Sequence, residues 1–224
     1  MQLTKGAIGN LINRYKAVLK KCHLLNVFGS LAVAGMLVMG GAAAAGAEEI
    51  TLDRDLQHSY TIKNGDSYTI NLNNFTLTGQ DDGEAILVED ATASIKNGTI
   101  KNDNSARAIS INNSTANIEN VNINTDKRSV NVIATESEKT AEAIFSNTNI
   151  TSEREDAAVF IQAKAENATA KVTINNTSIS GDWYALSGNG TNTGGKTEIT
   201  IRECPAYTLL YQFSPKDTGQ SKVK

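Results

Sequence analysis

Five asparagines share one local frame, in which an apolar residue lies two positions before the Asn and another lies three positions after it. The frame recurs at intervals of 23, 23, 27 and 29 residues. Its asparagines are Asn74, Asn97, Asn120, Asn147 and Asn176. Aliphatic residues follow the first four of them by 12 positions (Ile86, Ile109, Val132, Val159) and by 14 positions (Val88, Ile111, Ala134, Ile161). A period of this length, built from short segments, predicts a solenoid.

The segments between the asparagines have the pattern of β-strands. Tyr68, Ile70 and Leu72 alternate with polar residues, and the only prolines, Pro205 and Pro215, follow the repeats. Strands this short bury a face only when successive coils stack about 4.8 Å apart. We therefore expect an all-β, parallel β-helix of about five to six coils over residues 67–204. Residues 48–66 are interpreted as a lead-in or cap, and residues 205–224 as a C-terminal tail.

The framed asparagines have a physical role in this arrangement. A bend leaves backbone donors and acceptors unpaired, and an inward Asn can satisfy them while it bonds the Asn of the next coil. We expect a structural stack of Asn74, Asn97, Asn120, Asn147 and Asn176 inside the solenoid. The alternative is that Asn is simply abundant in this chain.

The two longer repeats carry their extra residues in one place. These residues fall in the segments 135–140 and 163–168, which are polar or small. Insertions on one face of a solenoid are often sites of binding. Neutral surface variation is the alternative, because loops tolerate insertion at low cost.

The first 47 residues have the composition of a signal peptide. Five basic residues precede an apolar run from Leu24 to Val38, and no acidic residue occurs in this part of the chain. A Gly/Ala stretch then ends at Ala47. We expect an N-terminal helical signal segment that is cleaved between Ala47 and Glu48. The alternative is a membrane anchor, since the run to Ala45 is about long enough to span a bilayer.

Charge and cysteine content limit the classes of partner and the disulfides that the chain can form. Without the leader cations the chain has 16 basic and 24 acidic residues, a net charge of about −8, which argues against nucleic acid. Cys22 belongs to the leader, so the mature chain would retain only Cys204 and no intrachain disulfide.

Few residues of this chain are suited to catalysis or metal binding. The only histidines are His23, in the leader, and His58, and no His/Cys metal spacing occurs. Asp82 and Glu155 would lie three coils apart, about 14 Å at the strand spacing, too far to act as a pair. Trp183 and Tyr184 either bind a sugar ring or, where the repeat fails, fill the core or cap the solenoid. We expect no catalytic residue, no metal and no cofactor.

The leader and the repeats together resemble a known family. The stretch from Asn13 to Lys21, which runs into the apolar segment, resembles the extended signal peptides of Gram-negative autotransporters. The Asn-bend repeats resemble their passenger domains, which are right-handed parallel β-helices of pectate-lyase-like architecture. The resemblance implies a secreted protein, or one displayed at the cell surface or outer membrane. The alternating strands of a C-terminal β-barrel do not follow the repeats. The outer-membrane barrel is therefore expected to be encoded elsewhere or lost, and the alternative is a free-standing secreted β-helix.

Three functions agree with these features. The first is a non-catalytic passenger that acts in adhesion or as a structural scaffold, with a ligand on a host or neighbouring cell. The second is a carbohydrate-active enzyme, a polysaccharide lyase or hydrolase. The third is an inactive, truncated autotransporter fragment. Fold alone does not decide among them; the sparse catalytic equipment favours the first.

Overall fold

The structure is a computed structural model that describes residues 48–80, 82–103, 106–154, 156–188, 195–202, 211–213 and 220–223. The predicted signal peptide, its helical segment and Ala47 lie outside the described residues. Glu48 is the first residue of strand β1 (Glu48–Thr51). Within the described part of the chain, no helix is long and apolar enough to cross a membrane.

The described residues form a parallel β-solenoid of about five turns. Each coil has a long face, a short face and a strand of a second sheet. The long face contains β1, β4 (Ser67–Asn71), the first halves of β7 (Thr92–Asn102) and β9 (Thr115–Thr125), β11 (Thr140–Ser146), β14 (Thr169–Asn175), β17 (Lys196–Arg202) and β19 (Gln220–Val223). The short face contains β2 (Leu56–Gln57), β5 (Thr76–Thr78), the second halves of β7 and β9, β12 (Asn149–Ser152) and β15 (Ser178–Gly181).

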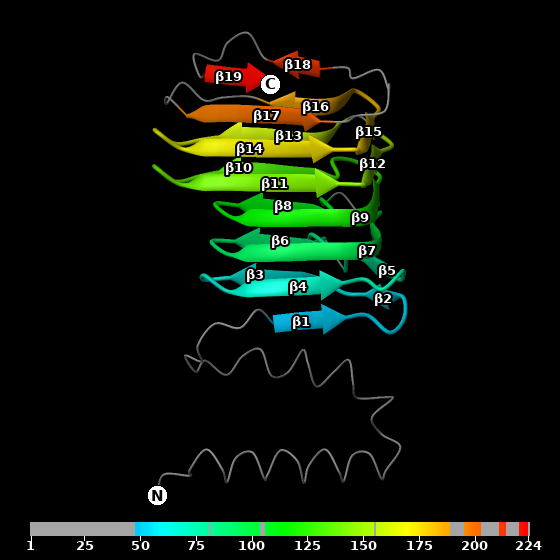
Figure 1. Ribbon diagram of the computed structural model, residues 1–224. Coiled ribbons are helices and arrows are strands. Elements are labelled where there is room, and N and C mark those ends of the chain that lie inside the picture. Colours follow the sequence, from blue (N-terminus) through cyan, green and yellow to red (C-terminus); the bar gives the residue numbers. More distant parts are fainter. Residues whose placement is uncertain are drawn as a thin grey trace, which may run out of the picture. The chain divides into compact units, whose positions relative to one another are not determined.

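The second sheet closes each coil. Its strands are β3 (Tyr60–Lys63), β6 (Ile86–Glu89), β8 (Ile109–Asn112), β10 (Val130–Ala134), β13 (Ala157–Ala163), β16 (Tyr184–Gly188) and β18 (Tyr211–Phe213). Every pairing in both sheets is parallel, for example β8 with β10. In Figure 1 the chain rises from β1 while it runs to the right along the front strands and returns to the left along the rear strands, which is a right-handed winding. The predicted fold class is confirmed.

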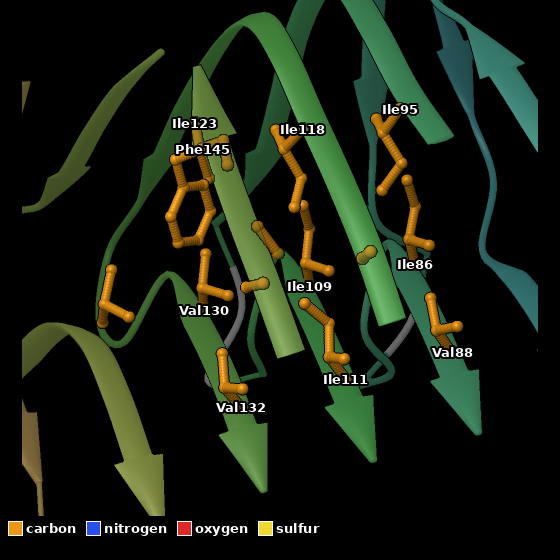
Figure 2. Close-up of a cluster of buried hydrophobic side chains, with 14 of the residues drawn as sticks. Ile86, Val88, Ile95, Ile109, Ile111, Ile118, Ile123, Val130, Val132 and Phe145 are labelled. Atoms are coloured by element: carbon orange, nitrogen blue, oxygen red, sulfur yellow. The ribbon is translucent and has the colours of Figure 1, made fainter. Parts of the chain in front are cut away.

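The core consists of apolar side chains that occupy the same position on successive coils. Figure 2 shows part of this core, where side chains of the long face meet those of the second sheet. The column of the short face contains Leu56, Leu77, Ile100, Ile123, Ile150 and Ile179. The column of the long face contains Ile70, Ile95, Ile118, Phe145, Ile174 and Ile201. These columns explain the recurrence of aliphatic residues in the sequence.

The register differs from the predicted one at two places. Val132 pairs with Ile111 rather than with Ile109, whose partner is Val130. On the long face Ile70, rather than Leu72, pairs with Ile95. Both differences are shifts of two residues. Because side chains of a strand alternate with a period of two, such a shift keeps the apolar residues on the inner face and leaves the hydrophobic pattern unchanged.

Regular pairing extends beyond the predicted range at both ends. In the predicted lead-in, β1 pairs with β4 and β3 pairs with β6, so residues 48–66 form most of a coil. In the predicted tail, β18 pairs with β16 and β19 pairs with β17. Stacking on an existing coil supplies backbone partners to these segments even where their own alternation is weak.

Tyr68 fixes β1 to the start of the core. Its side chain is 7% exposed, and burial raises the pKa of Tyr68 to about 12, with contributions from a hydrogen bond to Glu48 and from the charges of Glu48 and Asp66. The hydroxyl donates to the Glu48 carboxylate, so only the neutral phenol suits this position.

This environment predicts an alkaline loss of stability. Since the pKa of Tyr68 in the folded chain is raised above 10.0, its contribution is fully present below pH 10 and is lost as the pH rises toward about 12. We expect Tyr68→Phe to show a shallower fall in unfolding free energy over this range than the original chain, measured by urea denaturation. Parallel pH profiles of the two proteins would contradict this assignment.

The framed asparagines form the corner between the long and short faces. Asn74, Asn97, Asn120, Asn147 and Asn176 have φ values between 43° and 67°, in the left-handed region. Asn adopts this region at lower cost than other residues with a Cβ, because its short polar side chain can bond locally. Their main contribution is therefore to turn the chain.

The predicted inward orientation of these asparagines is wrong. Asn97 is half-buried and the other four are exposed. The residue that follows the Asn points inward instead, as in Val121, Thr148 and Thr177, which are 1 to 3% exposed. A left-handed residue reverses the alternation of the strand, so the side chain after the bend enters the core.

Gly98 occupies this inward position after Asn97. A Cβ at Gly98 would lie 2.5 Å from Leu72 Cβ and 2.6 Å from the Phe75 carbonyl oxygen. The absence of a side chain at Gly98 therefore makes room for Leu72. The corner of the first coil, which contains Leu72, is two residues longer than that of the next coil, and this difference causes the two-residue shift on the long face.

A second left-handed corner joins the second sheet to the long face, and sequence analysis missed it. Residues with positive φ in this corner are Asn64, Asp90, Asn113, Glu138 and Asn167. In the shorter coils the next residue again points inward: Ser114 Oγ accepts from Ala91 N at 3.0 Å and donates to Asn112 O at 2.7 Å. The variety of residue types at this corner hid the repeat.

Glu138 is the exception in this corner, because it has φ of 62° without the properties of Asn or Gly. Its place in the loop corresponds to that of Asn167 on the next coil, since Ala134 pairs with Ala163 and Thr140 with Thr169. We expect Glu138→Asn to stabilise the fold by about 1 kcal/mol, because the left-handed conformation costs other residues about 1–2 kcal/mol. Thermal denaturation measures this gain, and Asn167→Glu should cause a loss of similar size. Equal melting temperatures for all three proteins would contradict the prediction.

Candidate functional site

The asparagines predicted as a stack do contact one another, but on the surface. Asn120 Nδ2 donates to Asn97 Oδ1 at 3.4 Å, and Asn176 Nδ2 donates to Asn147 Oδ1 at 2.8 Å. Asn74 N donates to Asn97 O at 2.7 Å through the backbone. The exposed amides brace neighbouring coils along one edge and bring no reactive group together.

The two predicted insertions are loops that stack on each other. Residues 135–139 follow β10 and residues 164–168 follow β13. Ser137 Oγ donates to Glu166 O at 2.8 Å, and Lys139 Nζ lies 3.2 Å from Asp90 Oδ1. These contacts give the loops a defined structure at the second corner.

The short face presents its polar side chains in rows that run along the solenoid. The inward Leu77, Ile123 and Ile179 alternate with these polar residues. One row contains Thr76, Thr99, Asn122, Asn149 and Ser178, and the next contains Gln57, Thr78, Lys101, Asn124, Thr151 and Ser180. Hydroxyl and amide groups therefore cover most of this face.

A third row lies where the short face ends, and it is acidic. Asp103, Asp126, Glu153 and Asp182 each follow the last residue of a short-face strand, and those last residues pair across the coils. Asp103, Asp126 and Glu153 help to line a hollow of about 330 Å³ whose other lining residues are Lys101, Asn124, Thr125 and Arg154. Sequence analysis missed this row, although an acidic residue one position after each of four successive short-face strands, from β7 to β15, would have revealed it.

Buried polar side chains hold the loops that carry the acidic row. Asn102 Nδ2 donates to Arg107 O at 2.8 Å and to Gly83 O at 3.0 Å. On the next coil Thr125 Oγ1 donates to Lys127 O at 2.5 Å and lies 2.7 Å from Ser129 Oγ. Because these bonds are inside the protein, they restrain the loops more than surface contacts would.

The acidic row and the neighbouring Asp156 together form an acidic edge of the short face. Basic residues neutralise part of this edge. Arg154 Nε lies 2.7 Å from Asp126 Oδ1. Arg128 Nη2 donates to Asp156 Oδ1 at 2.8 Å, and the Arg128 guanidinium lies 4.2 Å from the centre of the Phe160 ring. Asp126 and Asp156 are thus held in ion pairs, whereas Asp103 and Glu153 extend into solvent on either side of the Asp126–Arg154 pair.

Trp183 lies at the same edge, two residues after the end of β15. It is 56% exposed, and its backbone N–H donates to Asp156 O at 3.4 Å. The alternative that Trp183 fills the core is therefore wrong, whereas Tyr184 begins β16 and is half-buried. Among the described residues Trp183 is the large apolar side chain that the fold leaves open to solvent.

The other residues weighed for chemistry do not converge. His58 stacks edge-on against Tyr60, with ring centres 4.6 Å apart. Asp82 is exposed in a turn, and Glu155 lies outside the described residues. No group of three or more His, Cys, Asp or Glu side chains in the described ranges has the geometry of a metal site.

Comparison with known protein families, with curated proteins and with solved structures gives no match. The candidate site therefore rests on its own geometry: rows of hydroxyl and amide groups, an acidic edge with a hollow, and an exposed tryptophan.

Proposed function

We propose that this chain is a non-catalytic β-helix that acts in adhesion or as a structural scaffold outside the cell, as the passenger of a Gram-negative autotransporter. The parallel solenoid with Asn corners supports the passenger assignment, together with the leader-like first 47 residues. Its ligand would be a molecule on a host or neighbouring cell, and we expect it to bind neither nucleic acid nor a cofactor.

The observation that carries this proposal is the short face. Its polar rows follow parallel strands of neighbouring coils, and the core columns behind them fix the spacing. A rigid surface loses little conformational entropy on binding, which favours recognition of an extended partner. The ion pairs of Asp126 and Asp156 also support a role for the acidic edge in structure rather than in proton transfer.

Adhesion of coated beads tests this function. Beads that carry the full chain are expected to bind epithelial cells or bacterial cells several-fold more than beads coated with albumin. The same protein should release no new reducing ends and no unsaturated sugars from polysaccharides. Beads that bind no better than the albumin control on any cell type would overturn the proposal.

The acidic row favours one second candidate, a glycoside hydrolase. The backbones of adjacent coils lie about 4.8 Å apart along the sheet, so carboxylates at the same position of neighbouring coils can reach the separation of about 5–5.5 Å found in retaining glycosidases. Glu153 and Asp126 are such neighbours in the hollow. Release of reducing ends that disappears in Glu153→Gln, with an unchanged melting temperature, would replace the first proposal with this one.

A further inference from the structure

The short face has the chemistry of a surface for an uncharged, hydrogen-bonding partner. Lys101 is the one charged side chain in its first two rows, and the others are Thr, Ser, Asn and, on β2, Gln57. Each hydroxyl both donates and accepts, and each amide offers two donors and an acceptor. A partner rich in hydroxyl groups satisfies such a surface, whereas an apolar partner would strand these groups without hydrogen bonds.

The repeat of the short face matches an extended sugar chain. Strands of adjacent coils are about 4.8 Å apart, and one pyranose ring with its glycosidic oxygen covers nearly the same length in an extended polysaccharide. A chain that lies along the solenoid axis therefore meets a new pair of side chains with each sugar. Asn122 and Asn124, on β9, are such a pair.

The negative charge of the acidic edge opposes an acidic partner and so favours an uncharged one. Asp103 and Glu153 are exposed, and their charges border the second row along the hollow. A polyuronate or a sulfated glycan would bring like charges beside these carboxylates, which opposes binding.

Trp183 adds a feature that the repeat does not explain. It follows β15, the strand at the C-terminal end of the described short face, and its indole is more than half exposed. The flat face of a sugar ring packs well against an indole, because the C–H groups of the ring bury apolar area there.

We propose that the short face binds an extended, uncharged polysaccharide that lies along the solenoid axis. Its hydroxyl groups hydrogen-bond the first two rows, and at the C-terminal end of the described short face one sugar ring reaches across the acidic edge to stack on Trp183, which lies opposite Asp156. The inference rests on the adhesive function proposed above and names the chemical class of its ligand.

Affinity electrophoresis of the full chain tests this inference, with hydroxyethyl cellulose and glycol chitin as neutral probes and polygalacturonate as the acidic one. We expect retardation by a neutral probe and none by polygalacturonate. Asn122→Glu should weaken the interaction about tenfold or more, since it places a charge in the first row. Trp183→Ala should weaken it as well.

Asn117→Glu is the matched control. Asn117 and Asn122 are both exposed asparagines of β9, but the corner at Asn120 places Asn117 on the long face. Asn117→Glu should bind as the original chain does, after mobilities are normalised to gels without polysaccharide.

Three results would overturn the inference: no retardation by either neutral probe, stronger retardation by polygalacturonate, or equal weakening by Asn117→Glu and Asn122→Glu. If coated beads adhere while the neutral probes fail, the ligand class is wrong and the adhesive function stands. If a neutral probe binds at the short face while the beads fail to adhere, the ligand class stands and the adhesive function is wrong.

Discussion

Phe145→Ala is expected to destabilise the solenoid by about 3–5 kcal/mol, the usual cost of truncating a fully buried phenylalanine. Phe145 is 0% exposed and lies in the long-face column between Ile118 and Ile174. Figure 2 shows its ring within the apolar interior. The strands on both sides are fixed by backbone hydrogen bonds, so the coil cannot collapse into the space that the ring leaves.

Phe160→Ala is the control for this substitution. Phe160 is half-buried on the outer side of the second sheet, where Arg128 lies over its ring. Loss of this contact should cost about 1 kcal/mol. Urea denaturation of both variants gives the comparison, and similar losses would contradict the assignment of Phe145 to the core.

Asn97→Leu is expected to destabilise the fold by about 2 kcal/mol, mainly because leucine must adopt a left-handed conformation that costs about 1–2 kcal/mol. Asn97 has φ of 61°. Its amide bonds to Asn71 and Asn120 are both 3.4 Å long and contribute the smaller part.

Asn97→Gly separates the two contributions. Glycine adopts positive φ without strain but has no amide, and it loses about 0.5–1 kcal/mol through its greater freedom in the unfolded chain. We therefore expect Asn97→Gly to remain within about 1 kcal/mol of the original chain in urea denaturation. If Gly and Leu destabilise the fold equally, the amide contacts, rather than the backbone conformation, hold this corner.

The fold was predictable because its signals are local and repeat. The apolar residues on either side of each framed Asn mark two strands, and the interval between frames marks one coil. The positions of the two stacked loops were also predictable, since residues 135–139 and 164–168 are the extra residues of the longer coils.

The register and the orientation of the asparagines were not predictable from these signals. A shift of two residues, such as that of Val132 to Ile111, leaves the apolar pattern intact. The frame shows that Asn97 lies at a bend, but an inward amide and a left-handed backbone both explain an Asn there. Only the φ value and the burial of the following residue separate them.

The candidate site was harder to predict than the fold. Asp103, Asp126 and Glu153 belong to loops of different length, so their common position emerges only when the short strands are aligned. The exposure of Trp183 depends on the loop after β15, which joins the second sheet two residues earlier than the loop after β12 does.

Disulfide formation between neighbouring coils tests the stacked register most directly. In a chain with Cys22 and Cys204 replaced by Ser, we expect Ser110→Cys with Asn131→Cys to form a disulfide. These residues are Cα partners on β8 and β10, at a spacing of about 4.8 Å that a disulfide can bridge. Ser110→Cys with Ile133→Cys should remain reduced, because Ile133 lies opposite Asn112. Preferential closure of the Ser110 and Ile133 pair, or closure of neither pair, would contradict the stacked register.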